Sequence, residues 1–252
     1  MGGSAQGEMA KRGNKVSVKA VLFDLDGTLL PTDTDAFGAA YIPDIASYME
    51  KRMNIPGALG LIMQATAATA ALHPGRLNKD VFFAPFAPYT SLNADGFERE
   101  LDDYYNREYP KFKALCSVEP RATEALRICR QKGLRTAIAT NPFFPQQVAR
   151  MRVDWAEIPS ELYEFITDYA HHAYTKPHVG YYLEVAEQLG VRAEECVMVG
   201  NDASDDLSAV EAGMRAFYLT DYAINKNHLP ERCDGRGSWN ELLAFLKALE
   251  AE

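Results

Sequence analysis

The stretch VKAVLFDLDGTLLP, residues 18–31, constrains the fold more than any other part of the sequence. Its apolar run ends in two aspartates, Asp24 and Asp26, which are one residue apart and are followed by Gly27 and Thr28. A continuous apolar run is typical of a strand that is buried on both faces of a parallel sheet. Ligands of such sheets bind beyond the carboxyl ends of the strands. The two aspartates therefore mark a candidate site, and their spacing places both side chains on one side of an extended chain.

The rest of the chain alternates short apolar runs with helical patterns. The runs that we expect to be strands are Val18–Phe23, Leu134–Thr140, Glu164–Thr167, Cys196–Gly200 and Ala216–Thr220. The segments with helical spacing of apolar residues are Pro120–Lys132, Val179–Leu189, Asp205–Ala212 and Ser238–Leu249. This alternation predicts an α/β fold with a doubly wound parallel sheet.

One long interval, residues 33–115, departs from the alternation. It carries helical patterns at Ala36–Met53, Ala58–Leu72 and Phe97–Phe112. An interval of this length is too long for a loop in a compact domain, so we expect an α-helical cap inserted after the first strand. The predicted division is a disordered leader that is no signal peptide (1–16), an α/β core (17–32 and 116–252) and the helical cap (33–115).

Polar side chains follow several of the predicted strands. Besides the first pair of aspartates, they are Thr140 and Asn141, then Lys176 before a helix, and finally Asn201, Asp202, Asp205 and Asp206. Two carboxylates about 4 Å apart repel by about 4 kcal/mol at an effective dielectric constant near 20, so this cluster needs cations or protons. Such oxygen ligands suit Mg²⁺, which commonly shares the phosphate of a substrate. Lys176 and the metal would together offset the charge of a phosphate dianion.

These residues resemble four motifs of the haloacid dehalogenase-like hydrolase superfamily, most members of which are phosphatases. The first motif, D-x-D-G-T, corresponds to residues 24–28, the second to Thr140, the third to Lys176, and the fourth to residues 200–206. All four occur in the expected order. The resemblance implies a Rossmann-like core with a helical cap, and it spans residues 18–32 and 116–235.

The resemblance also implies roles for single residues. Asp24 would attack phosphorus and form an aspartyl phosphate, and Asp26 would protonate the leaving oxygen and later activate water. Lys176 would neutralise charge in the transition state. Thr140 and Asn141 would bind phosphoryl oxygens, and the turn at Gly27 and Thr28 is counted with the substrate-binding residues. Mg²⁺ would be held by Asp24, by the backbone carbonyl of Asp26 and by Asp202.

The fourth motif departs from the common family pattern because Asn201 stands between the glycine and the first aspartate. Asp202 is the metal ligand that we expect, with Asp206 in a supporting role, while Asn201 could bind instead through its amide oxygen. The sequence does not rank Asp205 against Asp206. An acid at position 26 argues for transfer to or from an oxygen leaving group, because dehalogenases and phosphonatases of the superfamily lack it.

The sequence thus predicts a magnesium-dependent phosphohydrolase that acts on a small phosphorylated metabolite. Alternatives are a phosphomutase of the same superfamily and a catalytically idle binding module. The formal net charge of −9 argues against nucleic-acid partners. No apolar stretch is long enough to span a membrane, and the four cysteines form no C-x-x-C pair. We expect a cytoplasmic protein with reduced thiols.

Other residues have simpler interpretations. His171 and His172 are expected to be exposed and without a role, and Trp155 and Trp239 to serve packing. The aromatic residues Phe82, Phe83, Phe86 and Tyr89 could line a substrate pocket, although packing within the cap is favoured. A calcium loop at Asp24 is excluded because Leu29 stands where an EF-hand requires glycine.

Overall fold

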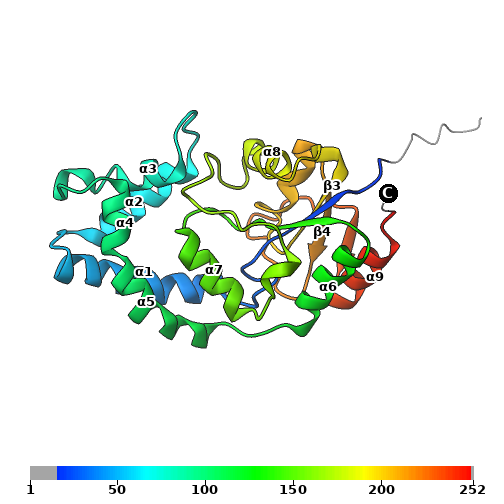
Figure 1. The fold of residues 1–252 in the computed structure, drawn as a ribbon, viewed down its shortest axis with the longest axis horizontal. Coiled ribbons are helices and arrows are strands. Elements are labelled where there is room, and N and C mark those ends of the chain that lie inside the picture. Colours follow the sequence, from blue (N-terminus) through cyan, green and yellow to red (C-terminus); the bar gives the residue numbers. More distant parts are fainter. Residues whose placement is uncertain (1–15, 251–252) are drawn as a thin grey trace, which may run out of the picture.

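The computed structural model describes residues 16–250 and contains a five-stranded, fully parallel sheet in the order β2-β1-β3-β4-β5 (Figure 1). The strands are β1 (Ala20–Phe23), β2 (Arg135–Ile138), β3 (Cys196–Gly200), β4 (Arg215–Leu219) and β5 (Gly235–Gly237). The first strand, β1, lies between β2 and β3, and its Ala20 is paired with Arg135 of β2 and with Cys196 of β3. The doubly wound α/β prediction is confirmed.

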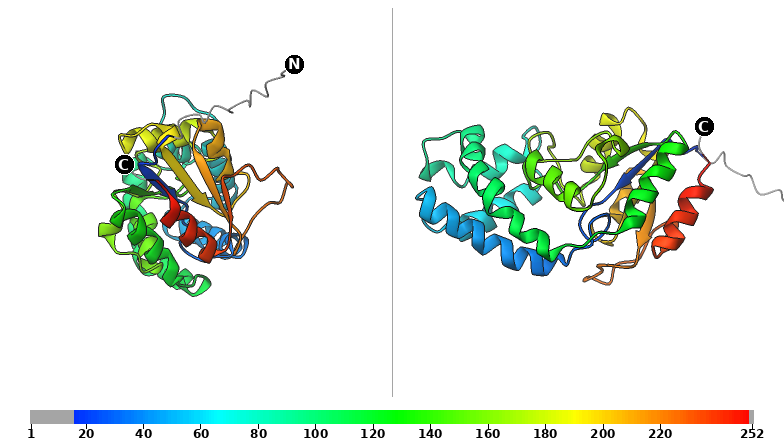
Figure 2. Two further views of the ribbon diagram at one scale, coloured as in Figure 1. Left: turned by 90° about the vertical axis from the view of Figure 1, so that its right-hand side faces the viewer. Right: turned by 60° about the horizontal axis from the view of Figure 1, so that its bottom comes forward.

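Helices cover both faces of this sheet (Figure 2). On one face, Val21 and Phe23 pack with residues of α6 (Pro120–Gln131), α7 (Gln146–Trp155) and α9 (Trp239–Ala248). On the other face, Ala20 and Leu22 pack with residues of α8 (Val179–Gln188) and of the 3-10 helix η5 (Leu207–Ala212). Because both faces are covered, every residue of β1 is buried, which explains its uninterrupted apolar sequence.

The chain between β1 and α6 is helical and lies at one end of the molecule (Figure 1). Its helices are α1 (Thr34–Arg52), α2 (Ala58–Ala70), α3 (Asn78–Phe83), α4 (Ala94–Glu100) and α5 (Asp102–Arg107), with 3-10 helices at Ala87–Tyr89 and Tyr109–Leu115. The side chain of Asp33 caps α1 by accepting hydrogen bonds from the backbone N–H groups of Asp35 and Ala36. These elements occupy the interval for which a cap was predicted. Its division from the core as a separate domain stays a prediction.

The sequence misplaced two elements of the sheet. The segment predicted as a third strand, Glu164–Thr167, forms only an isolated bridge between Ile166 and Ile138. It lies hydrogen-bonded beside β2 at the sheet edge but is too short for a ladder. The short edge strand β5 was not predicted, because its sequence Gly-Arg-Gly has no apolar residue.

Several helices also differ from the expectations. The single helix predicted at Phe97–Phe112 is divided into α4, α5 and a 3-10 helix, the last with Pro110 in its first turn. The helix predicted at Asp205–Ala212 is the 3-10 helix η5. Helices α3 and α7 were not predicted. The predicted leader at 1–16 lies outside the described residues except for Val16. Within residues 16–250, no helix combines the length and the apolar character needed to cross a membrane.

Candidate active site

The candidate site begins where β1 ends. Asp24 and Asp26 follow the strand, and Gly27 turns the chain with a positive φ of 80°. A Cβ atom at position 27 would collide with the Asn201 side chain. The Thr28 hydroxyl is buried and donates a 3.0 Å hydrogen bond to Oδ1 of Asn201. Asn201 in turn donates to the carbonyl of Tyr222 at 2.7 Å, so the turn after β1 is joined to the loop after β3.

Lys176 lies at the centre of the charged groups. Its Nζ donates hydrogen bonds of 2.7 Å to Oδ1 of Asp24 and of 2.7 Å to Oδ1 of Asp206. Its side chain is 1% exposed. Burial alone would lower the pKa of Lys176, but the two carboxylates outweigh that effect and raise it well above 10.5. The lysine therefore stays charged and joins β1 to the acidic loop.

Asp26 is paired with Arg152 from α7, a partner that the sequence did not indicate. The guanidinium forms an ion pair with Oδ1 of Asp26, and its side chain is only 5% exposed. It also lies over the Phe37 ring of α1, 4.5 Å from the ring centroid. Burial raises the pKa of Asp26 to about 6, an effect that Arg152 opposes and Asp24 reinforces. Arginines on amphipathic helices usually face solvent, so only the tertiary arrangement identifies this one.

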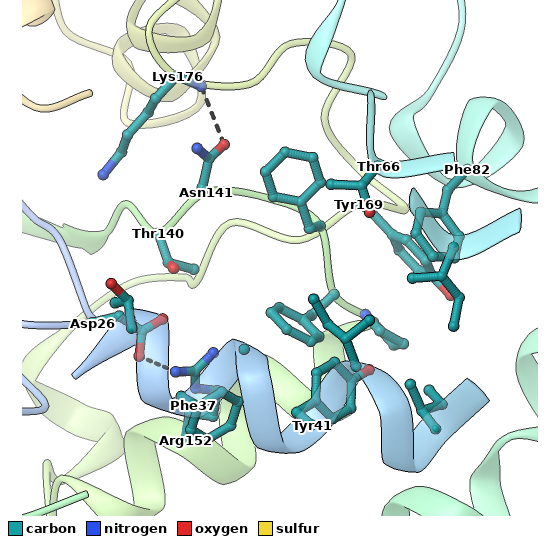
Figure 3. Close-up of a pocket in the computed structure, with 18 of the residues that line it drawn as sticks. Asp26, Phe37, Tyr41, Thr66, Phe82, Thr140, Asn141, Arg152, Tyr169 and Lys176 are labelled. Carbon is teal, nitrogen blue, oxygen red and sulfur yellow. Dashed lines mark hydrogen bonds and ion pairs between the residues drawn. The ribbon is translucent and has the colours of Figure 1, made fainter. Parts of the chain in front are cut away.

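The second motif is held by hydrogen bonds from neighbouring loops. Thr140 is nearly buried, and its backbone carbonyl accepts from the hydroxyl groups of Thr167 (2.6 Å) and Tyr181 (2.8 Å). The Asn141 amide donates to Oδ2 of Asp205 at 3.0 Å, while its Oδ1 accepts from the backbone N–H of Lys176 at 3.2 Å (Figure 3). The second, third and fourth motifs are thus connected.

The fourth motif forms a tight turn after β3. Oδ1 of Asp202 accepts from the backbone N–H groups of Ser204 (2.7 Å) and Asp205 (3.0 Å). The buried Asp206 accepts from the backbone N–H of Asp202 through Oδ2, at 2.9 Å. Burial raises the pKa of Asp206, and the ammonium of Lys176 opposes this rise. Asp206 therefore supports Asp202 and Lys176 and does not point freely into solvent.

A cavity of about 370 Å³ joins these groups to the helices that precede α6. Its polar end is lined by Asp24, Asp26, Thr140, Asn141, Arg152, Lys176, Asn201, Asp202, Asp205 and Asp206. Figure 3 labels Asp26, Thr140, Asn141, Arg152 and Lys176 among them. Gly27 and Thr28, which were counted with the substrate-binding residues, do not line it. Their contacts with Asn201 instead fix the turn, because Thr28 is fully buried beneath it.

The structure also tests what the sequence predicted for the aromatic residues, the tryptophans and the histidines. Phe82 and Phe83 line the cavity, whereas Phe86 is buried in packing and Tyr89 is exposed. Trp155 and Trp239 are buried, as predicted. The expectation for His172 is wrong: its ring is buried beside Phe165 and Tyr181, and burial lowers its pKa. All four cysteines are free.

The donor atoms present fit a magnesium ion. Within residues 16–250, no group of three His, Cys, Asp or Glu side chains is arranged to hold a metal unaided. However, Oδ2 of Asp24, Oδ2 of Asp202 and the backbone carbonyl of Asp26 accept no hydrogen bond from a described residue. Two carboxylates and one carbonyl, with waters, form the kind of oxygen set that Mg²⁺ uses. The polar end of the cavity is lined by five carboxylates and by two cations, Arg152 and Lys176, so this end has an excess of negative charge.

Comparison with known proteins agrees with this geometry. The haloacid dehalogenase-like hydrolase profile matches residues 18–213. A phosphoglycolate phosphatase of Rhodospirillum rubrum is 30% identical over 203 residues, covering 78% of this chain and 77% of the relative. One of Xanthomonas campestris pv. campestris is 28% identical over 201 residues, covering 78% and 80%.

A similar fold is found among solved structures. The crystal structure of a HAD phosphatase from Thermococcus onnurineus aligns with a TM-score of 0.58 at 21% identity. The alignment covers 93% of this chain and 100% of that chain, and at this identity the likeness concerns the fold alone. Together with the profile match, these similarities show that the chain belongs to the haloacid dehalogenase-like hydrolase family, as a phosphatase-type member.

Proposed function

We propose that the protein is a magnesium-dependent phosphohydrolase that removes the phosphoryl group of a small phosphorylated metabolite through an aspartyl-phosphate intermediate. The observation that carries the proposal is the buried ammonium of Lys176, held 2.7 Å from Oδ1 of Asp24 at the polar end of the cavity. A cation fixed beside a carboxylate is suited to neutralise the charge that a phosphoryl group brings to that carboxylate. The names of the curated relatives support the same reaction class.

The two aspartates have environments that suit different roles. Lys176 orients the Asp24 carboxylate through Oδ1, and this carboxylate accepts no other hydrogen bond from a described residue, which suits a nucleophile that also binds the metal. The pKa of Asp26 is raised to about 6, so its carboxyl group can carry a proton near neutral pH and deliver it to the leaving oxygen. Thr140 and the backbone at Asn141 lie on the same cavity and would bind phosphoryl oxygens.

Magnesium completes the proposed charge balance. Asp24, Asp202 and the backbone carbonyl of Asp26 would hold the ion, and when bound it would neutralise charge on the phosphoryl oxygens. Asn201 is engaged by Thr28 and Tyr222, which favours Asp202 over Asn201 as the ligand. A thermal shift with Mg²⁺ that is lost in Asp202→Asn would support this assignment.

The test of the proposal is hydrolysis of 4-nitrophenyl phosphate with and without Mg²⁺. Asp24→Asn should abolish turnover, and Asp26→Asn should lower it by about 10²–10⁴-fold. The control is Asp154→Asn, an exposed aspartate on α7 that does not line the cavity. A chain that folds and binds Mg²⁺ but hydrolyses no phosphate ester would refute the proposal.

The intermediate can be tested separately. Acid-quenched protein that has reacted with a ³²P-labelled ester should retain label that hydroxylamine releases, and Asp24→Asn should retain none. Product analysis with a sugar bisphosphate then distinguishes hydrolysis from phosphomutase action. Inorganic phosphate as the only phosphorus product supports the phosphohydrolase.

A further inference from the structure

We infer that the substrate's leaving group is uncharged and largely apolar, such as an aryl or alkyl alcohol. This inference rests on the proposed phosphatase function and names the substrate class of the same site. It follows from the half of the cavity that faces away from the aspartates. That wall can bury an apolar group, but among the described lining residues every cation is already paired, so an anionic group finds no free counter-charge.

The distal wall of the cavity is built from the helices between β1 and α6. Ile45 and Met49 come from α1, Ile62 from α2, Phe82 from α3 and Phe97 from α4, and all five line the cavity. Figure 3 shows the Phe82 and Tyr169 side chains close together across the cavity from Asp26. A phosphoryl group held at Asp24 would therefore direct its leaving group toward this wall.

The phenol groups of the wall are engaged with one another or with neighbours. The hydroxyl groups of Tyr41 and Tyr105 lie 3.4 Å apart and form a buried hydrogen bond. The Tyr169 hydroxyl is hydrogen-bonded to Glu98, a residue outside the cavity lining. These tyrosines thus present mainly their rings to the cavity, which increases its apolar character.

The cations that line the cavity are already paired. The described lining residues include Lys79, Arg152 and Lys176. Arg152 is paired with Asp26, and Lys176 with two aspartates. The Nζ atom of Lys79 is 2.5 Å from Oδ1 of Asp95 and 3.7 Å from Oε2 of Glu98. A carboxylate or second phosphate on the leaving group would therefore enter an apolar space without a free counter-charge.

Magnitudes separate the two kinds of ester. Each methylene group that moves from water into such a wall should improve kcat/KM about fourfold. A carboxylate placed there without a partner should lower kcat/KM by at least about tenfold. The cavity volume of about 370 Å³ lies toward the low end for small-molecule sites, so it suits a single ring or a short chain.

A matched pair of esters tests the inference on the unaltered chain. They are 4-methylphenyl phosphate and 4-carboxyphenyl phosphate, which differ only in a methyl group and a carboxylate. The carboxylated phenol is the better leaving group, so intrinsic reactivity works against the expected preference. We expect kcat/KM to be at least about tenfold higher for the methyl ester. Equal values, or a preference for the carboxylated ester or for 2-phosphoglycolate, overturn the inference while leaving the phosphatase proposal intact. Hydrolysis of no ester at all refutes the phosphatase proposal itself.

A variant tests the cause of the preference. Thr66 of α2 is half-buried and lines the distal wall (Figure 3). Thr66→Lys supplies the missing cation, and Thr66→Met is the control of similar length. We expect the lysine variant to shift the kcat/KM ratio toward the carboxylated ester by about tenfold and the methionine variant not to do so. An equal shift in both variants overturns the inference.

Product inhibition gives a measurement that needs no variant. 4-Methylphenol should inhibit the unaltered chain competitively at least about tenfold more strongly than 4-hydroxybenzoate, since each is the leaving alcohol of one ester. Stronger inhibition by 4-hydroxybenzoate contradicts the inference.

Discussion

Replacing Arg152 by methionine should reveal how much the buried pair with Asp26 contributes to stability. The side chains of Arg152 and Asp26 are 5% and 19% exposed, so the substitution leaves a largely buried carboxylate without its counter-ion. Breaking a buried pair costs about 3–5 kcal/mol. We expect Arg152→Met to lower the free energy of unfolding by about 3 kcal/mol at pH 8. The value lies at the lower end of the range because Asp26 keeps some contact with solvent.

The stability that Arg152→Met loses should increase with pH. Burial raises the pKa of Asp26 to about 6 although Arg152 opposes that rise, so the variant's pKa must be higher still. A carboxyl group with a raised pKa favours the folded chain at low pH and loses that advantage as the pH rises. The penalty of Arg152→Met therefore grows above pH 6, by up to about 1.4 kcal/mol per pH unit until the variant's own pKa is reached. Below pH 6 it should shrink to about 1 kcal/mol, which is the lost packing of Arg152 against Phe37.

The assay is urea-induced unfolding in the presence of a chelator, at pH 5.5 and pH 8, for the unaltered chain, Arg152→Met, Asp26→Asn and the double variant. The double variant removes the orphaned charge, so it should recover much of the stability and show no pH dependence from this pair. A penalty of Arg152→Met that is the same at both pH values would refute the reasoning. So would a coupling energy below about 0.5 kcal/mol in the four-variant cycle.

Three further outcomes follow from the structure. Gly27→Ala should lower the free energy of unfolding by about 2 kcal/mol or more, because the added Cβ combines a positive φ of 80° with a collision at Asn201. In urea titrations, adding Asn201→Ala should restore part of this loss. Lys176→Met should cost about 3–5 kcal/mol in chelator. Because the pKa of Lys176 is raised, its contribution is complete below pH 10.5 and lost above it, so alkaline unfolding curves should show this loss only in the unaltered chain. Burial lowers the pKa of His172, so the contribution of this residue to folding stability is present above pH 6.5 and lost at lower pH. His172→Gln should therefore flatten the dependence of unfolding free energy on pH between pH 5 and 7. An unchanged dependence would contradict this.

The sequence predicted most of the sheet because its strands are buried on both faces. All residues of β1 and β3 are buried, and such strands need continuous apolar runs that a sequence displays directly. Edge elements lack that requirement. The Gly-Arg-Gly strand β5 is partly exposed and has no apolar run, so the sequence did not reveal it. Residues 164–167 pair with the sheet on one side only, so the strand predicted there forms only an isolated bridge.

The candidate site divides in the same way. Asp24, Thr140, Lys176 and Asp202 lie directly after strands or before a helix, positions that strand order brings to one edge of the sheet. Their convergence on one cavity could therefore be anticipated from sequence order alone. The role of Thr28 in fixing the turn could not be anticipated. A side chain just beyond the cavity can point inward to Asn201 as readily as toward a ligand.

The cavity wall was beyond sequence reasoning for a different physical reason. Arg152 and Phe82 lie on helices whose apolar spacing fits burial against the core as well as burial against a ligand. What distinguishes the two is whether atoms fill the space that the side chain faces, and that depends on how α1, α2 and α3 are placed across from α7. In the proposed reaction, the motifs at the strand ends determine where the phosphoryl group is attacked, and the placement of these helices determines which alcohol can leave. Family membership therefore specifies the reaction class in this chain, and the pairing of every lining cation among the described residues narrows the substrate within that class.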